Sequence, residues 1–441
     1  MANIIPFRGV LYNPAASGDI AQVVAPPYDV IDAEAQRALH ARNPHNVIRL
    51  ELGLDEPGDG PACNRYTRAA GLLQSWLAGG VLRRDREPAI YPYQIEYVPP
   101  AAGPDAGTRV LKGFLSTVEL ADFGTGRVYP HENTRAAAKE DRLRLLEACR
   151  SNFSPIWSLF SDPEGGILGL LDKSVDTDRP RLDFRDDAGF RHRLWAITDR
   201  TVLGEIAEAM HPKPLFIADG HHRYETALAY RNLRRRQAGA GQSNGLRPYD
   251  SVLMLFSSLE DPGLTILPTH RVLRTQPPPL AELAVQLRGA FTFEEFPFQE
   301  QAEADARRRF IGTLRARGLA GHAFGLALRG VPRYVVLSLR PDQPVLANPS
   351  ARDRLDVSIL HSSILGRLCP SKADEEAIFY TKDDDEALDW VRRGSAEAAL
   401  LLNPTKVSEV RAVAAAGERM PHKSTYFFPK PLTGLVMNVM D

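Results

Sequence analysis

The feature that most constrains the fold of this chain is a short apolar strand that leads directly into a helix near the middle of the sequence. Residues 215–218 are uniformly apolar and are typical of a buried strand. Residues 220–235 follow with apolar side chains at helical spacing, and residues 194–197 and 202–210 show the same strand–helix order just before. The sequence therefore predicts a mixed α/β (α+β) fold, with this strand–helix unit inside a larger, multi-layered protein.

Length and composition indicate a folded protein with a large core. Of the 441 residues, 44% are hydrophobic and 25% are charged, which is enough for two or three domains. Lys and Arg number 54, and Asp and Glu number 55. A chain with this balance lacks the long-range field that attracts nucleic acid, so DNA is disfavoured as a partner.

The alternation of polar and apolar stretches predicts three domains. We expect an N-terminal α/β domain over residues 1–165, a central domain over 185–275, and a C-terminal α/β domain over 276–441 that packs back on the functional site. The polar tract 162–184 marks the first boundary. Within the first domain, the apolar and β-branched residues 47–50 predict a strand.

Cysteine usage and the N-terminal residues indicate the compartment. Cys63, Cys149 and Cys369 lie far apart, without metal-ligand spacing, and are too few for a disulfide framework in a chain of this length. The first residues lack the pattern of a signal peptide, and no run of about 18 apolar residues occurs. We therefore expect a cytoplasmic protein without a membrane partner, and the oligomeric state stays open.

The central strand–helix turn is the strongest candidate site. The first N–H groups of a helix have no acceptor within it, and they attract an anion such as phosphate. Gly220 lets the backbone approach a ligand, and Arg223 offers parallel donors to phosphate oxygens. Asp219 and Glu225 add carboxylates that could hold Mg²⁺. We predict four phosphate-binding residues in this turn: Gly220, His221, His222 and Arg223.

A simpler interpretation makes these residues purely structural. Asp219 then caps the helix, the two histidines satisfy backbone groups, and Arg223 pairs with Glu225 or another acid. We favour the functional interpretation, because four polar groups beside a buried strand are costly unless they are used or fully paired.

A second polar cluster precedes the helix that we predict after residue 134. Phosphoryl transfer to a hydroxyl needs a group that accepts the proton, and the carboxylate of Glu132 or Asp219 is suited to that task. We predict four catalytic residues: Asp219, Glu132, His131 and His222. Capping by Asn133 or Thr134 explains the second cluster equally well.

Two further segments could bring positive charge to the same ligand. A diphosphate or triphosphate carries more charge than one arginine and a helix start can offset. We predict five additional phosphate ligands: His270, Arg271, Lys423, Ser424 and Thr425. Alternatively, His270 and Arg271 are a surface pair, and Lys423 and Lys430 flank an exposed strand to keep it soluble.

Several segments in this order resemble a family of bacterial and archaeal proteins known as domain of unknown function 1015. The resemblance extends over nearly the whole chain. The matching segments are residues 7–9, 25–30, 43–44, 46–50, 130–132 with 134, 218–225, 267–271 and 423–430.

The Asp-Gly-His-His-Arg core, residues 219–223, is also similar to the motif of the ParB/sulfiredoxin-like superfamily, which includes free-serine kinases, partition proteins and sulfinic acid reductases. In those kinases the turn holds nucleotide phosphates, so the resemblance assigns residues 220–223 to phosphate binding and Asp219 to the reacting end. It covers only about residues 194–235. The reductases' cysteine is absent beside the motif, and no basic helix-turn-helix follows it, so reduction and DNA partitioning are disfavoured.

Together, the residues and the resemblance predict an enzyme. We expect a small-molecule kinase that uses a nucleotide, ATP or ADP, with Mg²⁺ and phosphorylates a small hydroxylated metabolite. A serine-like amino acid is the first guess for that acceptor, which would place the enzyme in serine metabolism. The alternatives are a metal-dependent phosphatase or phosphodiesterase, and a nucleotide-binding regulatory protein without turnover.

Overall fold

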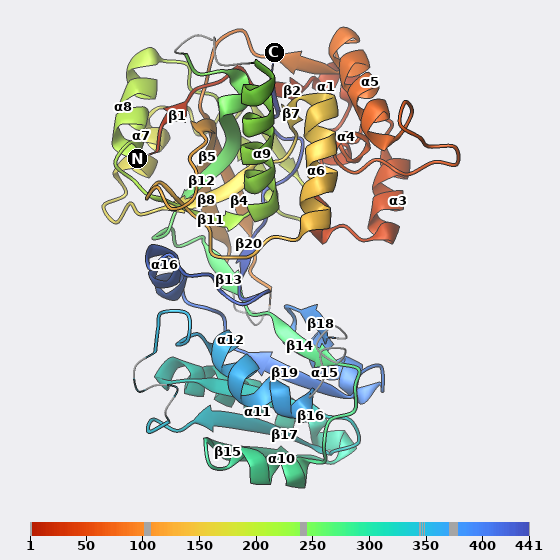
Figure 1. Ribbon diagram of the computed structural model, residues 1–441, viewed down its shortest axis with the longest axis vertical. Helices are drawn as coiled ribbons and strands as arrows, with labels where there is room; N and C mark the ends of the chain where they lie inside the picture. The colour runs from red at the N-terminus through yellow and green to blue at the C-terminus, as the bar shows by residue number, and fades with distance from the viewer. Residues whose placement is uncertain are drawn as a thin grey trace.

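A mixed sheet forms the centre of the larger of two lobes (Figure 1). The computed structural model describes residues 2–100, 107–238, 245–343, 345, 347, 349–369 and 378–440. Within these residues the strands of the sheet run in the order β6 (Val128–Tyr129), β11 (Leu215–Asp219), β8 (Ile156–Phe160), β12 (Ser251–Ser258), β5 (Arg109–Glu119), β4 (Tyr91–Tyr97), β10 (Arg191–Leu194) and β9 (Leu182–Arg185). A further strand, β1 (Ile4–Ile5), pairs with β5.

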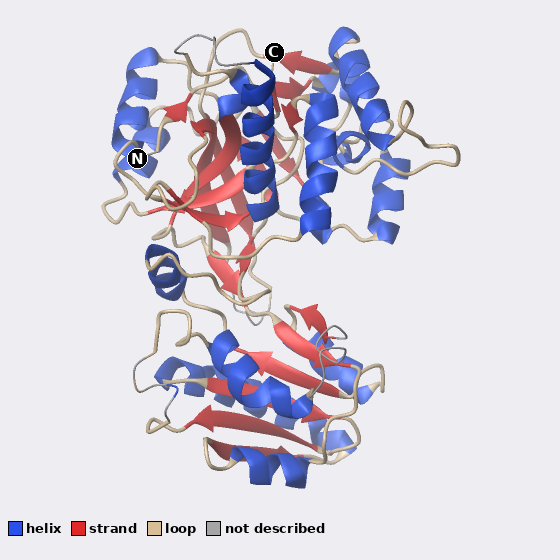
Figure 2. Ribbon diagram, in the orientation of Figure 1, coloured by secondary structure: helices blue, strands red, loops and turns tan. Residues whose placement is uncertain are grey.

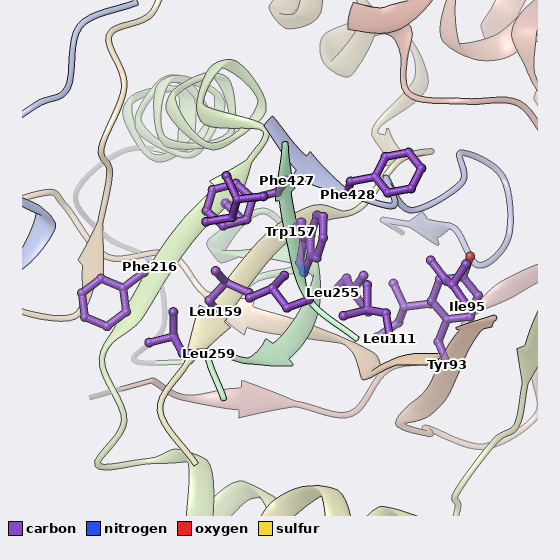
Figure 3. Packing of buried hydrophobic residues seen from close by; sticks show 14 of the residues in the cluster. Tyr93, Ile95, Leu111, Trp157, Leu159, Phe216, Leu255, Leu259, Phe427 and Phe428 are labelled. Atoms are coloured by element: carbon purple, nitrogen blue, oxygen red, sulfur yellow. The ribbon is translucent and has the colours of Figure 1, made fainter. Parts of the chain in front are cut away.

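The central strands are buried because their apolar side chains alternate between two layers. Leu255 of β12 lies opposite Leu115 of the antiparallel strand β5 and Trp157 of the parallel strand β8. On the face that carries these residues, Phe427 and Phe428 from the C-terminal segment complete the packing (Figure 3). The C-terminal segment is therefore part of the core of the larger lobe.

Helices cover the opposite face of this sheet. Residues of α7 (Gly166–Lys173), α8 (Arg200–Met210) and α9 (His221–Ala238) form an apolar cluster with it. Alongside α9 lies α6 (Ala136–Cys149), which packs on α5 (Arg65–Ala78). A separate cluster joins α5 and α6 to three N-terminal helices: α2 (Ile20–Val23), α3 (Ala33–Arg42) and α4 (Ile48–Glu51). The short helix α1 (Pro14–Ser17) contacts α2.

The smaller lobe contains an antiparallel sheet with helices packed against it (Figure 2). Its strand order is β15 (Phe291–Pro297), β17 (Arg333–Leu339), β16 (Ala323–Leu328), β19 (Ala398–Leu402), β14 (His270–Leu273) and β18 (Ile378–Thr381). One apolar cluster includes α10 (Leu280–Leu287), α12 (Asp356–Ile359), the π-helical stretch Leu360–Leu365 and α13 (Gly366–Leu368). A second includes α11 (Glu303–Ala320) and α15 (Asp384–Arg392).

The chain passes between the lobes twice. On the outward passage β13 (Thr265–Leu267) pairs with β20 (Tyr426–Phe428) of the return passage, which follows α16 (Val407–Ala415). The return segment then joins the larger lobe, where Thr433 pairs with Ala25 and Met437 pairs with Val10. Short strand pairs complete this region: β2 (Val10–Tyr12) with β3 (Leu82–Arg84), and β21 (Asn438–Val439) with β7 (Ser151–Asn152).

The mixed α/β class and the central strand–helix corner agree with the sequence, whereas two other expectations do not. The predicted strand over 47–50 is the short helix α4, because the side chain of Asn46 accepts the N–H of Ile48 at 2.9 Å and turns the chain. The predicted boundary at 162–184 does not separate two sheets, since strands from both sides of it share the large sheet. No helix in the described ranges is long and apolar enough to cross a membrane.

Candidate active site

The turn between β11 and α9 is built around a glycine in a left-handed conformation. Gly220 has a φ of 96°, and a Cβ placed there would lie 2.9 to 3.0 Å from the guanidinium of Arg223. The N–H of Tyr224 donates to the carbonyl of Gly220 at 3.0 Å. The N–H groups before it have no acceptor within the helix, so α9 begins with donors suited to an anion.

A pocket of about 920 Å³ opens beside this turn. Both lobes contribute to it, with α9 in the larger lobe and β18 in the smaller one (Figure 1). Its lining residues are Tyr28, Asp29, Glu132, Arg135, Ala138, Asp219, Gly220, His221, His222, Arg223, Ile378, Tyr380, His422 and Lys423. A volume near the upper end of the usual range of about 300–1,000 Å³ can hold a cofactor together with a small substrate.

Asp219 ends β11 as a buried carboxylate held between two cations. The ammonium of Lys430 contacts one oxygen, and Arg223 donates to the other at 2.5 Å. Burial alone would raise the pKa of Asp219, but the charges of Lys430 and Arg223 outweigh it and lower the pKa to about 2. Asp219 is therefore ionised and already neutralised, and its contacts fix the cations in place.

Arg223 is turned back beneath the glycine. Besides Asp219, its guanidinium donates to the carbonyl of Pro155, and its buried Nε has no acceptor among the described residues. The side chain is 9% exposed. The small exposed part of the Arg223 guanidinium therefore adds positive charge to the pocket, and most of its N–H groups stabilise the turn itself.

His221 and His222 are fixed in one tautomer each when neutral. The N–H of His131 donates to Nε2 of His221 at 3.2 Å, and the N–H of Arg135 donates to Nε2 of His222 at 2.9 Å. Burial lowers the pKa of both rings, in His221 to about 3. Since each Nε2 accepts, each neutral ring carries its proton on Nδ1 and acts there as a hydrogen-bond donor.

Glu132 supplies a carboxylate to the same pocket, and its side chain is 30% exposed. One oxygen lies 3.9 Å from Nδ1 of His221, and the other lies 3.3 Å from both Nδ1 of His422 and the backbone N of Lys423. Burial favours a higher pKa, but the hydrogen bond with His422, the rings of His221 and His131 once they are protonated at low pH, and the N–H of Lys423 lower the pKa of Glu132 well below its usual range. Glu132 is the ionised, partly accessible acceptor of the pocket.

His131 lies behind His221 and away from solvent. The two rings are 4.6 Å apart between centroids, and Nε2 of His131 lies 3.0 Å from the hydroxyl of Thr425. The carbonyl of His131 accepts the N–H of Met420 at 2.7 Å. His131 and Thr425 thus connect the α9 turn to the C-terminal segment from behind the pocket.

Glu225 does not share a ligand position with Asp219. Its carboxylate accepts from Thr134 at 2.7 Å and from Lys139 at 2.9 Å, while Asp219 is occupied by its own two cations. Within the described residues there is no group of three or more His, Cys, Asp and Glu side chains placed to hold a metal ion. Asp219 and Glu225 in this arrangement do not fit a Mg²⁺ site.

Of the additional phosphate ligands predicted from the sequence, Lys423 lines the pocket and the others lie outside its lining. Lys423 lines the pocket and has a φ of 57°. Ser424 is buried and donates to the carbonyl of Pro421 at 2.6 Å. His270 is buried in β14, with Nε2 3.0 Å from Asp384. None of Ser424, Thr425, His270 and Arg271 is among the described residues that line the pocket.

Arg271 is fully buried, and its role is to hold the loop that carries Lys423. Its guanidinium donates to the carbonyls of Thr269, His422 and Lys423, the last two at 3.2 and 3.1 Å. With no carboxylate beside it among the described residues, burial lowers the pKa of Arg271 to about 10. Arg271 therefore positions Lys423 by binding the backbone.

The sequence did not predict Lys430 as a site residue, nor seven of the described residues that line the pocket: Tyr28, Asp29, Arg135, Ala138, Ile378, Tyr380 and His422. Lys430 lies under the turn and also contacts Asp29 at 3.2 Å. Tyr28 and Asp29 belong to the segment 25–30, which had been noted without a role. Lys430 belongs to the segment 423–430, of which only Lys423, Ser424 and Thr425 had been predicted as ligands. Arg135 and Tyr380 had no comparable signal, because only the tertiary structure brings them to the pocket.

Comparison with protein families identifies the chain. The family whose pattern it matches is described as protein of unknown function (DUF1015), and the match covers residues 4–358. The chain belongs to this family. No curated protein matches this DUF1015 chain.

Solved structures similar to the DUF1015 chain include a free serine kinase mutant in complex with AMP, at 13% identity and a TM-score of 0.34, covering 71% of this chain and 89% of that one. A conserved hypothetical protein from Pyrococcus furiosus has 13% identity, a TM-score of 0.32 and coverages of 71% and 92%. SbnI with a C-terminal truncation, from Staphylococcus aureus, has 12% identity, a TM-score of 0.34 and coverages of 72% and 85%. Likeness of this size decides neither activity nor ligand, which must be argued from the pocket.

Proposed function

We propose that this protein transfers a phosphoryl group from a nucleotide, ATP or ADP, to the hydroxyl of a small metabolite, with a serine-like amino acid as the first candidate acceptor. The observation that carries the proposal is that one pocket contains both an anion-binding helix start and an ionised carboxylate, Glu132. Phosphoryl transfer needs both of these parts, one for the phosphates and one for the acceptor hydroxyl.

The phosphates would lie against the start of α9. The free N–H groups there, the Nδ1–H of His222 and the edge of Arg223 all offer donors. Arg135 and Lys423 are exposed on the pocket rim and add positive charge. Neutral histidines suit this role, because their protons stay in place as donors across the physiological pH range.

The acceptor hydroxyl would donate to Glu132. As the acceptor oxygen bonds to phosphorus, the bond from phosphorus to the leaving phosphate oxygen breaks, and the hydroxyl proton passes to the Glu132 carboxylate. The products are a phosphate ester and a nucleotide with one phosphate fewer. His422 and the N–H of Lys423, each 3.3 Å from one carboxylate oxygen, would hold Glu132 in position.

Phosphorus NMR tests the proposal directly. The protein is incubated with ATP or ADP and serine, with and without added Mg²⁺, and the expected product is phosphoserine. Free phosphate would instead indicate a hydrolase, and an unchanged spectrum would indicate binding without turnover.

The Glu132→Gln variant is nearly isosteric and should lower turnover by about 10²-fold or more, because it cannot accept the proton. Glu140→Gln changes an exposed carboxylate on α6, outside the pocket, and is the matched control. Turnover by Glu132→Gln at the wild-type rate would remove Glu132 from the reaction.

A further inference from the structure

Two tyrosines line the pocket, one from each lobe, and each has an arginine behind its ring. Tyr28 lies between α2 and α3 of the larger lobe, and Tyr380 lies in β18 of the smaller lobe. The guanidinium carbon of Arg142 lies 4.3 Å from the centre of the Tyr28 ring, and that of Arg271 lies 5.3 Å from the centre of the Tyr380 ring. Both tyrosines are only half-buried.

Arg142, which lies behind the Tyr28 ring, is held in place by two ion pairs. Arg142 is 6% exposed, and it donates to Glu51 at 3.1 Å and to Asp141 at 2.5 Å. Ser154 also donates to Glu51 at 3.1 Å, so the buried carboxylate has two partners. Because Arg142 cannot move freely, it holds one face of the Tyr28 ring and leaves the ring's other surface to the pocket.

The ring of Tyr380 is fixed in a comparable way. Arg271 is held by three backbone carbonyls, and the ring of His422 meets Tyr380 edge-on, with 6.0 Å between centroids. Ile378, two residues earlier on the same strand, adds apolar surface to the pocket. This side of a largely polar pocket therefore presents an aromatic and aliphatic surface.

We propose that Tyr28 and Tyr380 form the subsite for the base of the nucleotide, by stacking on its planar ring. This inference rests on the proposed function and names the part of the ligand that the phosphate site leaves unexplained. A nucleotide has one large planar apolar group, and an aromatic ring whose back is occupied by an arginine can accept such a group on its front. Because the tyrosines come from different lobes, the base would also connect them.

The test compares two ligands that differ in the base. ATP and inorganic tripolyphosphate are titrated into the full-length protein by calorimetry. Stacking predicts that the wild type binds ATP at least about tenfold more tightly than tripolyphosphate. Tyr380→Ala should weaken ATP binding by about 5- to 100-fold and leave tripolyphosphate binding unchanged. Tyr380→Phe, which keeps the ring, should bind ATP like the wild type.

Tyr249→Ala is the matched control, because Tyr249 is also half-buried with an arginine 5.9 Å from its ring centre and lies outside the pocket. It should bind ATP normally. If ATP and tripolyphosphate bind the wild type equally, or if Tyr380→Ala weakens both alike, the base subsite is refuted while the phosphate site stands. If neither ligand binds the wild type, the proposed function itself fails. The wild-type comparison needs no variant, so a misfolded variant does not leave the question open.

Discussion

Gly220 has a backbone conformation that residues with a side chain rarely adopt, and the space for a Cβ is filled by Arg223. We expect Gly220→Ala to lower the free energy of unfolding by about 1–3 kcal/mol, because Arg223 is tied to Asp219 and cannot easily move aside. Urea unfolding measures this. Gly71→Ala is the control, since Gly71 lies inside α5 with open space around it. This substitution should raise the free energy of unfolding by about 0.5–1 kcal/mol. Equal stability of Gly220→Ala and wild type would contradict the tight packing of this turn.

The buried histidines make stability depend on pH. In the folded state the pKa of His221 is lowered from 6.5 to about 3, so between these values the unfolded chain binds a proton that the folded chain does not. Stability should therefore fall as the pH drops through this window, by up to about 1.4 kcal/mol per pH unit for this one group. The pKa values of His131 and His222 are lowered too and act in the same direction.

The free energy of unfolding, measured in urea at pH 6.5, 5.5 and 4.5, should accordingly fall less steeply with decreasing pH in His221→Asn than in the wild type. Exposed His211→Asn, at the end of α8, should keep the wild-type slope. The carboxylate of Asp219, whose pKa is lowered to about 2, loses its contribution only below about pH 4, so it does not mask the effect. Identical slopes for both variants would mean that His221 is not kept neutral.

At the scale of elements, the loop before β20 carries Lys423 into the pocket. Glu132 accepts its N–H and Arg271 binds its carbonyl, so the backbone is held while the ammonium stays exposed. We expect Lys423→Ala to weaken tripolyphosphate binding about tenfold, with less dependence on salt and no change in Tm. Exposed Lys173→Ala, at the end of α7, should leave binding unchanged. Unaltered affinity in Lys423→Ala would show that the loop does not reach the ligand.

Elements defined by local pattern were predictable, and those defined by partners were not. The β11–α9 corner is confirmed because an apolar run followed by Asp-Gly and helical spacing is a local signal. Ile48 and Leu50 are apolar because α4 is buried on nearly every side, and periodicity cannot distinguish such a short buried helix from a strand. Lys430 looked like a charge flanking a strand, and only the fold shows it buried under Asp219.

For the whole molecule, the return of the chain to the larger lobe is the decisive feature. Removing residues 424–441 deletes Phe427 and the partners of Ala25 and Val10. We expect this truncated protein to lose its cooperative thermal transition and to expose apolar surface, seen as calorimetry without a peak and as dye binding. Removing only residues 2 and 3 is a milder control, because it deletes the backbone hydrogen bond of Asn3 with Glu119 but none of the paired residues of β1. A cooperative transition in the truncated protein would mean that the core is complete without β20.

The same return sets the order in which the protein can mature during translation. Domains generally fold as they leave the ribosome, from the N-terminal side onward. Here the larger lobe must wait with an open sheet face while the whole smaller lobe is synthesised, and Lys430 emerges only after that lobe. Asp29 and Asp219 face each other without their shared cation until then. Chains that stop before residue 430 should therefore lack the complete pocket and be recognised by quality control, which ties formation of the pocket to synthesis of the return segment.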